Sequence, residues 1–242
     1  MRNEFVEKLP KARNIDYSGS DVLEIMAEAV KYNSFLTNEV LSHAPKSGHV
    51  LDFGAGIGTF SAPVAKLGLQ VTCVEYDDGQ RAKIKELHGL ASVKRIEDVA
   101  DTSIDYVFTL NVLEHIEDDV KALKQLYRVL KPGGRLYVFV PAYQLLYSEF
   151  DRRIGHYRRY HKAGLVRAVA KADFKEIEAR YHDSLGFAAA LAYKLVSKQD
   201  GKVSPSTVGI YDRYVFPLSR VLDIAASPFI GKNVGLTARK PF

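Results

Sequence analysis

Hydrophobic and polar positions between residues 50 and 140 follow two periods in turn. Short runs rich in β-branched and aromatic residues stand between longer stretches in which apolar residues recur about every 3.6 positions. The strand-like runs are HVLDF at 49–53, QVTCVEY at 70–76, ASVKRI at 91–96, IDYVFTL at 104–110 and RLYVFV at 135–140. Strands that alternate with helices predict a mostly parallel, doubly wound α/β sheet.

The helices between these strands are predicted at 59–67, 80–88 and 118–130. The last of them has one apolar stripe, as a helix packed on a core does. This stripe consists of Val120, Leu123, Leu126, Tyr127 and Leu130. LKPGG at 130–134 then supplies the proline and glycines that end a helix before the next strand.

Further elements flank this region. Residues 21–41 are predicted as one or two amphipathic helices. After residue 145 come a basic aromatic stretch, a helix, a strand, two apolar helices and a last strand. They are predicted near 162–172, at 174–182, at 184–196, at 214–231 and at 234–240. The C-terminal third therefore extends the sheet and closes over one end of it.

Composition fits a globular protein, because 242 residues with 47% apolar side chains supply a substantial core. The net charge of +5 is spread along the chain, whereas nucleic-acid binding needs a concentrated basic patch. Cys73 is the only cysteine and lies in an apolar strand, so we expect it buried, with no intrachain disulfide. No secretory leader or apolar run of ~18 residues is apparent, so we expect a cytoplasmic protein.

The stretch VLDFGAGIGTF at 50–60 is the first candidate site. Gly54, Gly56 and Gly58 follow a strand, but Thr59 stands where a dinucleotide fingerprint needs its third glycine, and no Gly-Lys-Ser/Thr of a phosphate loop follows. Asp52 would repel a pyrophosphate and favours a ligand with positive charge. Glu75 ends the next strand, where a carboxylate accepts hydrogen bonds from ribose hydroxyls. These residues indicate a nucleoside with a cationic attachment.

Five segments in this order resemble the class I S-adenosylmethionine-dependent methyltransferases. They are VLDFGAGIGTF, VTCVEYDD, VKRIEDV, IDYVFTLNVLEHIEDD and LKPGGRLYVFVPA, all between residues 50 and 142. The resemblance implies a seven-stranded Rossmann-like sheet whose last strand is antiparallel. It also implies S-adenosylmethionine as cofactor and methyl transfer as activity.

The resemblance also implies cofactor-binding roles. The turn Gly54, Ala55, Gly56 and Gly58 would wrap the methionine part, and Asp52 would serve its ammonium group. The nucleoside would contact Glu75, Tyr76, Glu97 and Asp98, while Asn111 and Leu113 would line the floor below the sulfonium. Gly58 is equally explained by helix packing, Tyr76 by surface exposure, and Glu97 or Asp98 by capping of the next turn.

The stretch YSGSDVLEIMAEAVKYNSFL at 17–36 resembles the helical lid of one branch of this family. Tyr17, Tyr32 and Asn33 would close over the cofactor, or pack as an aromatic core. We therefore predict a lid at 1–45, the cofactor-binding core at 46–145 and an acceptor-side elaboration at 146–242 with a helical insertion and the last strands.

The same branch carries a GHxRRY signature, present here as GHYRRY at 155–160. Arginine forks grip phosphate or carboxylate, so Arg158, Arg159 and Tyr160 are predicted to bind an anionic acceptor. The alternative is a loop whose arginines pair with Glu149 and Asp151. His182 or Asp183 stands where the branch has an asparagine before the apolar helix, which weakens any analogy on the acceptor.

His115 and His156 are candidate general bases for a hydroxyl acceptor, each with a structural alternative. Glu114 is expected to be structural, and no metal site is predicted. Catalysis otherwise needs alignment of the acceptor and exclusion of water.

The segment 214–230 is predicted to pack on the domain through Val215, Leu218, Leu222, Ala225 and Phe229, or alternatively to lie on a membrane. In the second case the acceptor is a lipid or a lipid-linked sugar.

We expect a small-molecule or lipid-linked acceptor and no nucleic acid. The rivals are a catalytically silent binding partner and an RNA methyltransferase, for which the tetrapeptide Asn/Asp-Pro-Pro-Tyr/Phe is missing at NVLE, 111–114.

Overall fold

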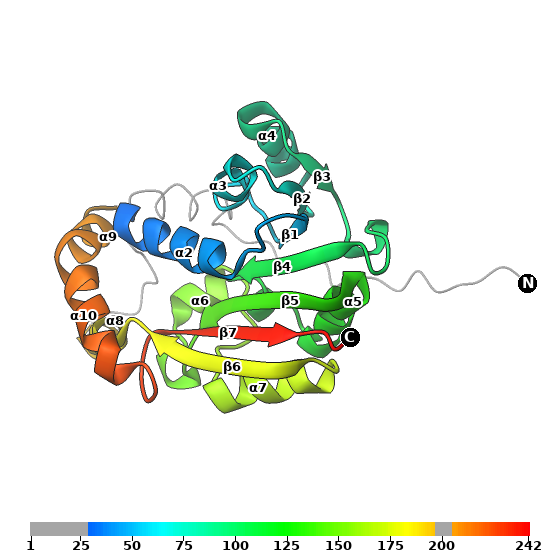
Figure 1. The fold of residues 1–242 in the computed structure, drawn as a ribbon. Coiled ribbons are helices and arrows are strands. Elements are labelled where there is room, and N and C mark those ends of the chain that lie inside the picture. Colours follow the sequence, from blue (N-terminus) through cyan, green and yellow to red (C-terminus); the bar gives the residue numbers. More distant parts are fainter. Residues whose placement is uncertain (1–28, 197–204) are drawn as a thin grey trace, which may run out of the picture.

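The computed structural model describes residues 29–196 and 205–242, and its centre is one seven-stranded sheet (Figure 1). The strand order is β3-β2-β1-β4-β5-β7-β6. The strands are β1 His49–Phe53, β2 Gln70–Val74, β3 Ala91–Val93, β4 Ile104–Leu110, β5 Leu130–Pro141, β6 Lys175–His182 and β7 Asn233–Arg239. β7 pairs antiparallel with both β5 and β6, and the other strand pairs are parallel, so the predicted sheet and its antiparallel last strand are confirmed.

Helices cover both faces of the sheet, as a doubly wound fold requires. One apolar cluster contains side chains of α2 Val30–His43, α3 Ser61–Lys66 and α4 Asp78–His88. The opposite cluster contains side chains of α5 Asp119–Val129 and α7 Lys162–Lys171. The sheet therefore separates two cores, and its central strands are buried from both sides.

The α5 helix illustrates why local sequence predicted these elements well. Asp118 caps it by accepting a hydrogen bond from the backbone N–H of Lys121. Leu123 and Leu126 are fully buried, and the helix ends at Val129 where β5 begins. Its period, cap and stop residues all agree, so this prediction is confirmed to within one residue at each end.

The α2 helix accounts for only part of the predicted N-terminal lid, because residues 1–28, including Tyr17, lie outside the described residues. The first turn of α2 is capped from far along the chain. Asp212 accepts the backbone N–H groups of Lys31 and Tyr32 at 2.9 and 2.8 Å. Phe35 and Val40 then pack into the core. A distant carboxylate therefore fixes where this helix begins.

The remaining helices gather at the end of the sheet where β5 and β6 end and β7 begins (Figure 1). They are α6 Glu149–Arg153, α8 Ser184–Val196, α9 Pro205–Ile210, the π-helical turn η4 Tyr211–Val215 and α10 Phe216–Ala226. Three short 3-10 turns complete the fold: η1 Ile96–Asp98, η2 Leu113–His115 and η3 Gln144–Leu146.

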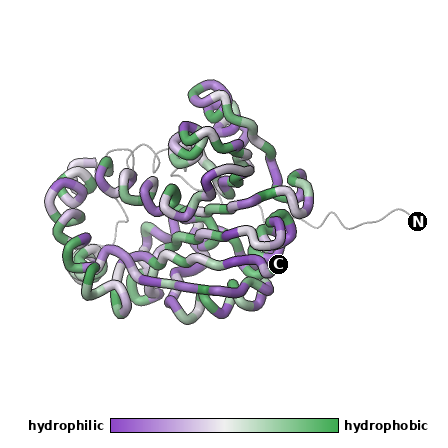
Figure 2. The backbone as a smooth tube through the Cα atoms, in the orientation of Figure 1, coloured by the Kyte–Doolittle hydropathy of each residue, from purple (hydrophilic) through white to green (hydrophobic). Residues whose placement is uncertain are grey.

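The predicted packing face of the α10 segment is wrong. Its buried residues are Phe216, Ser219 and Asp223, whereas Leu218 and Leu222 are 55% and 44% exposed. The buried side of this helix is set by a polar contact. Asp223 accepts the backbone N–H groups of Asp183 and Ser184 at 2.8 and 2.9 Å and so caps the start of α8. This contact turns the apolar side outward, and Figure 2 shows hydrophobic positions along this helix at the edge of the molecule.

The exposed apolar side of α10 extends from α9 to the loop after α10. Its members are Ile210, Tyr214, Leu218, Val221, Leu222, Ile224 and Phe229. Within residues 29–196 and 205–242, no helix is long and apolar enough to cross a membrane.

Candidate functional site

The carboxyl ends of three neighbouring parallel strands meet at one edge of the sheet, because β1 pairs with both β2 and β4. The turn after β1, the acidic end of β2 and the residues after β4 therefore share this edge. Ligands of open α/β sheets bind at such an edge, near the point where the strand order reverses. Most of the predicted cofactor residues lie here.

The turn after β1 has a backbone that only glycine adopts freely. Gly54, Gly56 and Gly58 have φ values of 80°, 56° and 84°. A Cβ at Gly54 would lie 2.3 Å from a methyl carbon of Val112, so the β1 turn and the segment after β4 approach each other too closely for any side chain. The turn therefore offers a ligand bare main chain.

Glu75 lies across this turn. Its Oε2 accepts the backbone N–H of Gly56 at 2.8 Å, and its Oε1 accepts the backbone N–H of Asp77 at 2.9 Å. Each carboxylate oxygen keeps a lone pair for another donor. The side chain is thereby fixed as a paired acceptor next to the glycine turn, which is the arrangement that two neighbouring hydroxyls require.

Asp52 is the buried acid of the turn, only 3% exposed. Its Oδ2 accepts the hydroxyl of Ser61 at 2.5 Å, and burial raises the pKa of Asp52 to about 7. Ser61 also contacts the thiol of Cys73 at 3.2 Å. Burial raises the pKa of this thiol to about 12, so the prediction of a buried Cys73 is confirmed and the thiol stays protonated.

The predicted adenine-side residues lie at the surface. Tyr76 is 64% exposed with the Lys94 ammonium 5.1 Å from its ring centre. Asp98 accepts the backbone N–H of Arg95 at 3.2 Å, which is the capping role weighed as its alternative, and Glu97 is exposed beside it. Their place at the rim leaves binding of adenine as a prediction.

The segment after β4 has a strained residue at its start. Asn111 is exposed and has φ = 54°, and its backbone N–H donates to the carbonyl of Phe139 at 2.8 Å. Non-glycine residues with positive φ are concentrated at functional sites. Leu113, by contrast, points into the apolar core and is fully buried, so its side chain does not line a floor.

The described lid residues pack into an aromatic cluster. The ring of Tyr32 contacts that of Phe216 at 5.3 Å between centroids and that of Phe139 at 6.5 Å. Asn33 is the next residue of α2 and is partly buried. For Tyr32 the geometry is that of aromatic packing, the alternative weighed from the sequence.

The three predicted acceptor-binding residues all have partners within the chain. Arg159 forms a bidentate pair with Asp151 at 2.8 and 2.9 Å and is only 10% exposed. Arg158 pairs with Asp119 at 3.2 Å, and the Tyr160 hydroxyl donates to Asp119 at 2.8 Å. The intramolecular alternative therefore describes Arg159 and Tyr160, which are buried, while Arg158 remains partly exposed.

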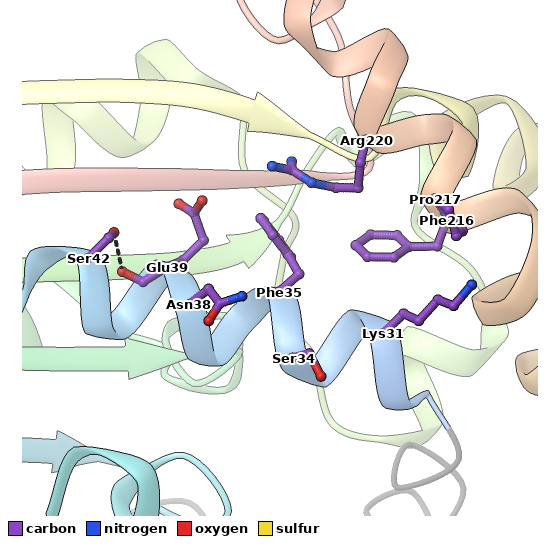
Figure 3. Close-up of a pocket in the computed structure, with 9 residues that line it drawn as sticks. All are labelled: Lys31, Ser34, Phe35, Asn38, Glu39, Ser42, Phe216, Pro217 and Arg220. Carbon is purple, nitrogen blue, oxygen red and sulfur yellow. Dashed lines mark hydrogen bonds between the residues drawn. The ribbon is translucent and has the colours of Figure 1, made fainter. Parts of the chain in front are cut away.

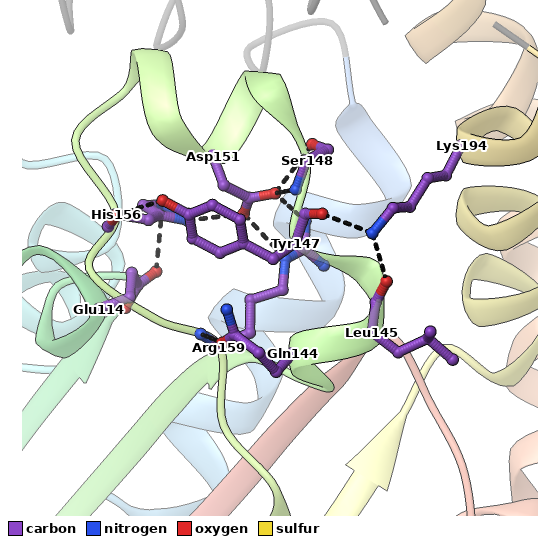
Figure 4. Close-up of polar contacts among 9 residues, drawn as sticks. All are labelled: Glu114, Gln144, Leu145, Tyr147, Ser148, Asp151, His156, Arg159 and Lys194. Carbon is purple, nitrogen blue, oxygen red and sulfur yellow. Dashed lines mark hydrogen bonds and ion pairs between the residues drawn. The ribbon is translucent and has the colours of Figure 1, made fainter.

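Asp151 organises this stretch (Figure 4). Besides Arg159, it accepts the backbone N–H and hydroxyl of Ser148, and it contacts Nδ1 of His156 at 2.8 Å. Burial alone would raise the pKa of Asp151, but the hydrogen bonds from His156 and Arg159 hold that pKa well below its ordinary value. The sequence predicted Asp151 only as an arginine partner, and the capping-box pattern SEFD at 148–151 is a signal that could have found its wider role.

His156 faces a second acid. Its Nε2 lies 3.9 Å from Oε1 of Glu114, and its ring packs edge-on against His115 at 4.6 Å between centroids. Glu114 is fully buried, and neither of its carboxylate oxygens has a hydrogen-bond partner in the described part of the chain. Burial raises the pKa of Glu114 to about 8. Glu114 was expected to be structural, and nothing in the spacing of the sequence signalled this unpaired carboxylate.

The sequence position noted before α8 is also built into the fold. His182 is buried against the rings of Phe35 and Phe139, and burial lowers the pKa of its imidazole to about 3. Asp183 accepts the hydroxyl of Tyr211 at 2.5 Å and the backbone N–H of Gly186 at 3.1 Å. Both residues therefore serve the α8 junction.

A separate groove of about 520 Å³ lies between α2 and α10 (Figure 3). Its walls include the rings of Phe35 and Phe216, with Lys31, Glu39 and Arg220 around them. None of its lining residues belongs to the predicted cofactor set. The groove is therefore apart from the glycine turn.

Known proteins resemble this chain over the part of the sheet that carries the glycine turn. Residues 51–138 match the family described as methyltransferase domain. The ubiquinone biosynthesis O-methyltransferase of Xanthomonas oryzae pv. oryzae is 37% identical over 99 residues, which cover 37% of this chain and 41% of that relative. The enzyme of the same name from Xanthomonas axonopodis pv. citri is 35% identical over 104 residues, covering 39% and 43%. This chain thus spans about two fifths of the curated relatives it matches.

Solved structures extend the likeness to almost the whole chain at the level of the fold. Phosphoethanolamine N-methyltransferase 2 of Haemonchus contortus, in complex with S-adenosyl-L-methionine, superposes with a TM-score of 0.64 at 20% identity, covering 95% of this chain and 59% of that one. A possible histamine N-methyltransferase of Thermotoga maritima gives a TM-score of 0.63 at 17% identity, covering 91% and 95%.

Proposed function

We propose that this chain, whose residues 51–138 form a methyltransferase domain of the class I S-adenosylmethionine-dependent fold, transfers a methyl group from S-adenosylmethionine to an acceptor. The observation that carries the proposal is the carboxylate of Glu75, fixed by the backbone of Gly56 and Asp77 beside a turn of bare main chain. This arrangement fits a ribose diol next to an amino-acid group.

The residues at this edge fit the cofactor by charge as well. Asp52, when ionised, places a negative charge beneath the turn, where the ammonium group of S-adenosylmethionine would be held. Glu75 would accept both ribose hydroxyls, and residues 54–56 would contact the methionine part through their backbone. When bound, the sulfonium supplies an activated methyl group. The protein then has to align an acceptor and exclude water.

For the acceptor we propose a small-molecule or lipid-linked hydroxyl compound with an anionic group. His115 lies in the short turn after β4, and His156 packs against it from the loop after α6. These two side chains are the proposed groups to handle its proton. Arg158, 31% exposed and paired with Asp119, is the basic residue of the GHYRRY segment open to an anion. The O-methyltransferase names of the curated relatives support an oxygen nucleophile.

A lipid-linked acceptor is supported by the exposed apolar side of α10, which lies beside the exposed cations Lys31 and Arg213. An apolar helix side with a basic rim fits an anionic bilayer surface. We therefore propose that the reaction takes place at such a surface, on its cytoplasmic side. Flotation with anionic vesicles tests this choice, and absence of binding would leave the small-molecule acceptor alone.

Transfer of a labelled methyl group from S-adenosylmethionine to a panel of phenols, glycolipids and RNA tests the function. We expect label on a hydroxyl compound and none on RNA. Binding of the cofactor without turnover on any member of the panel would favour the catalytically silent partner. Label on RNA would favour the nucleic-acid rival.

A further inference from the structure

The cluster of Glu114, His115 and His156 has the composition of a cation site. Each residue offers one ligand atom, and these atoms lie within 4.8 Å of one another. Glu114 and His115 belong to the short turn after β4, and His156 comes from the loop after α6. The backbone N–H of Tyr157 donates to the carbonyl of Glu114 at 2.7 Å and ties the two segments together. Distant parts of the chain are thus joined at this cluster.

We propose that Glu114, His115 and His156 bind one divalent transition-metal ion, of which Zn²⁺ is the reference case. Two histidines and a carboxylate form a three-residue set that leaves a position open on zinc or iron. Ligand distances of about 2.1 Å place the donor atoms of one such ion roughly 3.3 Å apart. The present 3.9 Å between Glu114 Oε1 and His156 Nε2 has only to close by about half an ångström.

The unpaired carboxylate of Glu114 is the independent observation that points to a ligand. Its side chain has no exposed surface, and both oxygens lack a partner among residues 29–196 and 205–242. A buried carboxylate without a hydrogen bond is unfavourable unless a cation or a proton compensates it. A metal ion between Glu114 and the histidines satisfies an oxygen that the fold leaves unpaired.

The surroundings of His156 match those of a metal ligand. Its Nδ1 contacts Asp151 at 2.8 Å, which directs Nε2 toward Glu114. Metal-binding histidines commonly donate their other ring N–H to a carboxylate in this way. The nearby Arg159 charge is offset by Asp151, whose two oxygens pair with Nε and Nη2 of the guanidinium, while Nη1 has no hydrogen-bond partner in the described part of the chain.

The cluster is also accessible. His115 is exposed, whereas Glu114 is buried and His156 is 8% exposed, so the site opens to solvent at His115. Three protein ligands leave a coordination position for an oxygen atom from water or an acceptor. With an ion bound, His115 and His156 would serve as ligands, and the ion instead of a histidine base would lower the pKa of an acceptor hydroxyl. This role toward an acceptor rests on the proposed function, but binding of the ion does not.

The test uses the untagged full chain after treatment with a chelator. Co²⁺ is titrated and followed by its visible absorption, and Zn²⁺ affinity is measured by competition with a chromophoric chelator. We expect one ion per chain. Glu114→Gln and His115→Ala should each weaken Zn²⁺ binding at least ~100-fold, and Asp151→Asn by about 10- to 100-fold. The controls Glu117→Gln and His161→Ala change exposed residues of the same types and should bind like wild type.

Two outcomes would overturn the site: a wild-type chain that binds neither ion, or Glu114→Gln and His115→Ala chains that bind as tightly as wild type. Circular dichroism and thermal melting verify the fold of each variant. If Glu114→Gln does not fold, His115→Ala decides alone, because its exposed ring is not part of the core. Cofactor binding is measured separately, so failure of the metal site leaves the proposed function standing.

Discussion

The glycine turn at 54–58 and the basic stretch at 148–160 carry comparable sequence signals but are built differently. In the turn, backbone conformation decides the chemistry, since Gly54 has φ = 80° and the backbone of Gly56 holds Glu75. In the basic stretch, acidic side chains determine which arginines stay free. Asp151 pairs with Arg159, and Asp119 pairs with Arg158. A run of arginines in the sequence therefore does not show which of them can bind an external anion, because the fold determines their acidic partners. Alternate glycines, by contrast, indicate the backbone conformation of the turn directly.

The largest expected effect is on the basic stretch. Asp151→Ala leaves Arg159 buried without its carboxylate, which should lower the free energy of unfolding by about 3–5 kcal/mol in urea denaturation. Glu149→Ala, which removes the partner of the more exposed Arg152, is the matched control and should leave the midpoint near that of wild type. Equal effects of the two variants would mean that the basic stretch is a solvated loop after all.

Asp52, the acid beneath the turn, should make the free energy of unfolding depend on pH, with a smaller effect than that of Asp151→Ala. The pKa of Asp52 is about 7 in the folded chain and near 3.8 when exposed, so the folded state binds the extra proton between these values. Stability due to Asp52 is present below pH 4 and is lost as the pH rises toward 7. Relative to Asp52→Asn, wild type should lose roughly 2–4 kcal/mol across this window.

Denaturation of both proteins at several pH values measures that difference. The comparison with Asp52→Asn is needed because His43, His49 and His182 have lowered pKa values and act in the opposite direction. A difference between the two proteins that does not change with pH would contradict a buried, protonated Asp52.

Substitution of the turn itself separates backbone strain from contact. Gly54→Ala brings a Cβ within 2.3 Å of Val112 at a φ of 80° and should destabilise the chain by about 1–3 kcal/mol. Gly68→Ala has the same strain, with φ = 81°, but its Cβ meets nothing within 4 Å, so it should cost less. Thermal melts of Gly54→Ala, Gly68→Ala and the double variant Gly54→Ala with Val112→Ala separate the cost of backbone strain from the cost of the contact with Val112. Equal effects at both glycines would contradict the close approach.

The sheet could be predicted from the sequence because the strands and helices from β1 to β5 follow their own periods, and α4 and α5 also have capping residues. The α10 face was predicted wrongly because the buried side of that helix is chosen by Asp223, which caps α8 almost forty positions earlier in the chain. The unpaired Glu114 was missed for a similar reason, since His156 and Glu114 meet only in the folded chain. Polar contacts between residues far apart in the sequence produce no periodic pattern from which they could be predicted.

The central claim is that Glu75, fixed beside the glycine turn, holds the ribose of the cofactor. Calorimetric titration of S-adenosylhomocysteine into wild type, Glu75→Ala and the exposed control Glu86→Ala tests it most directly. Loss of two hydrogen bonds to a charged acceptor should weaken binding at least ~100-fold in Glu75→Ala, with Glu86→Ala unchanged. Equal affinity in all three proteins, or no binding to wild type, would contradict the account.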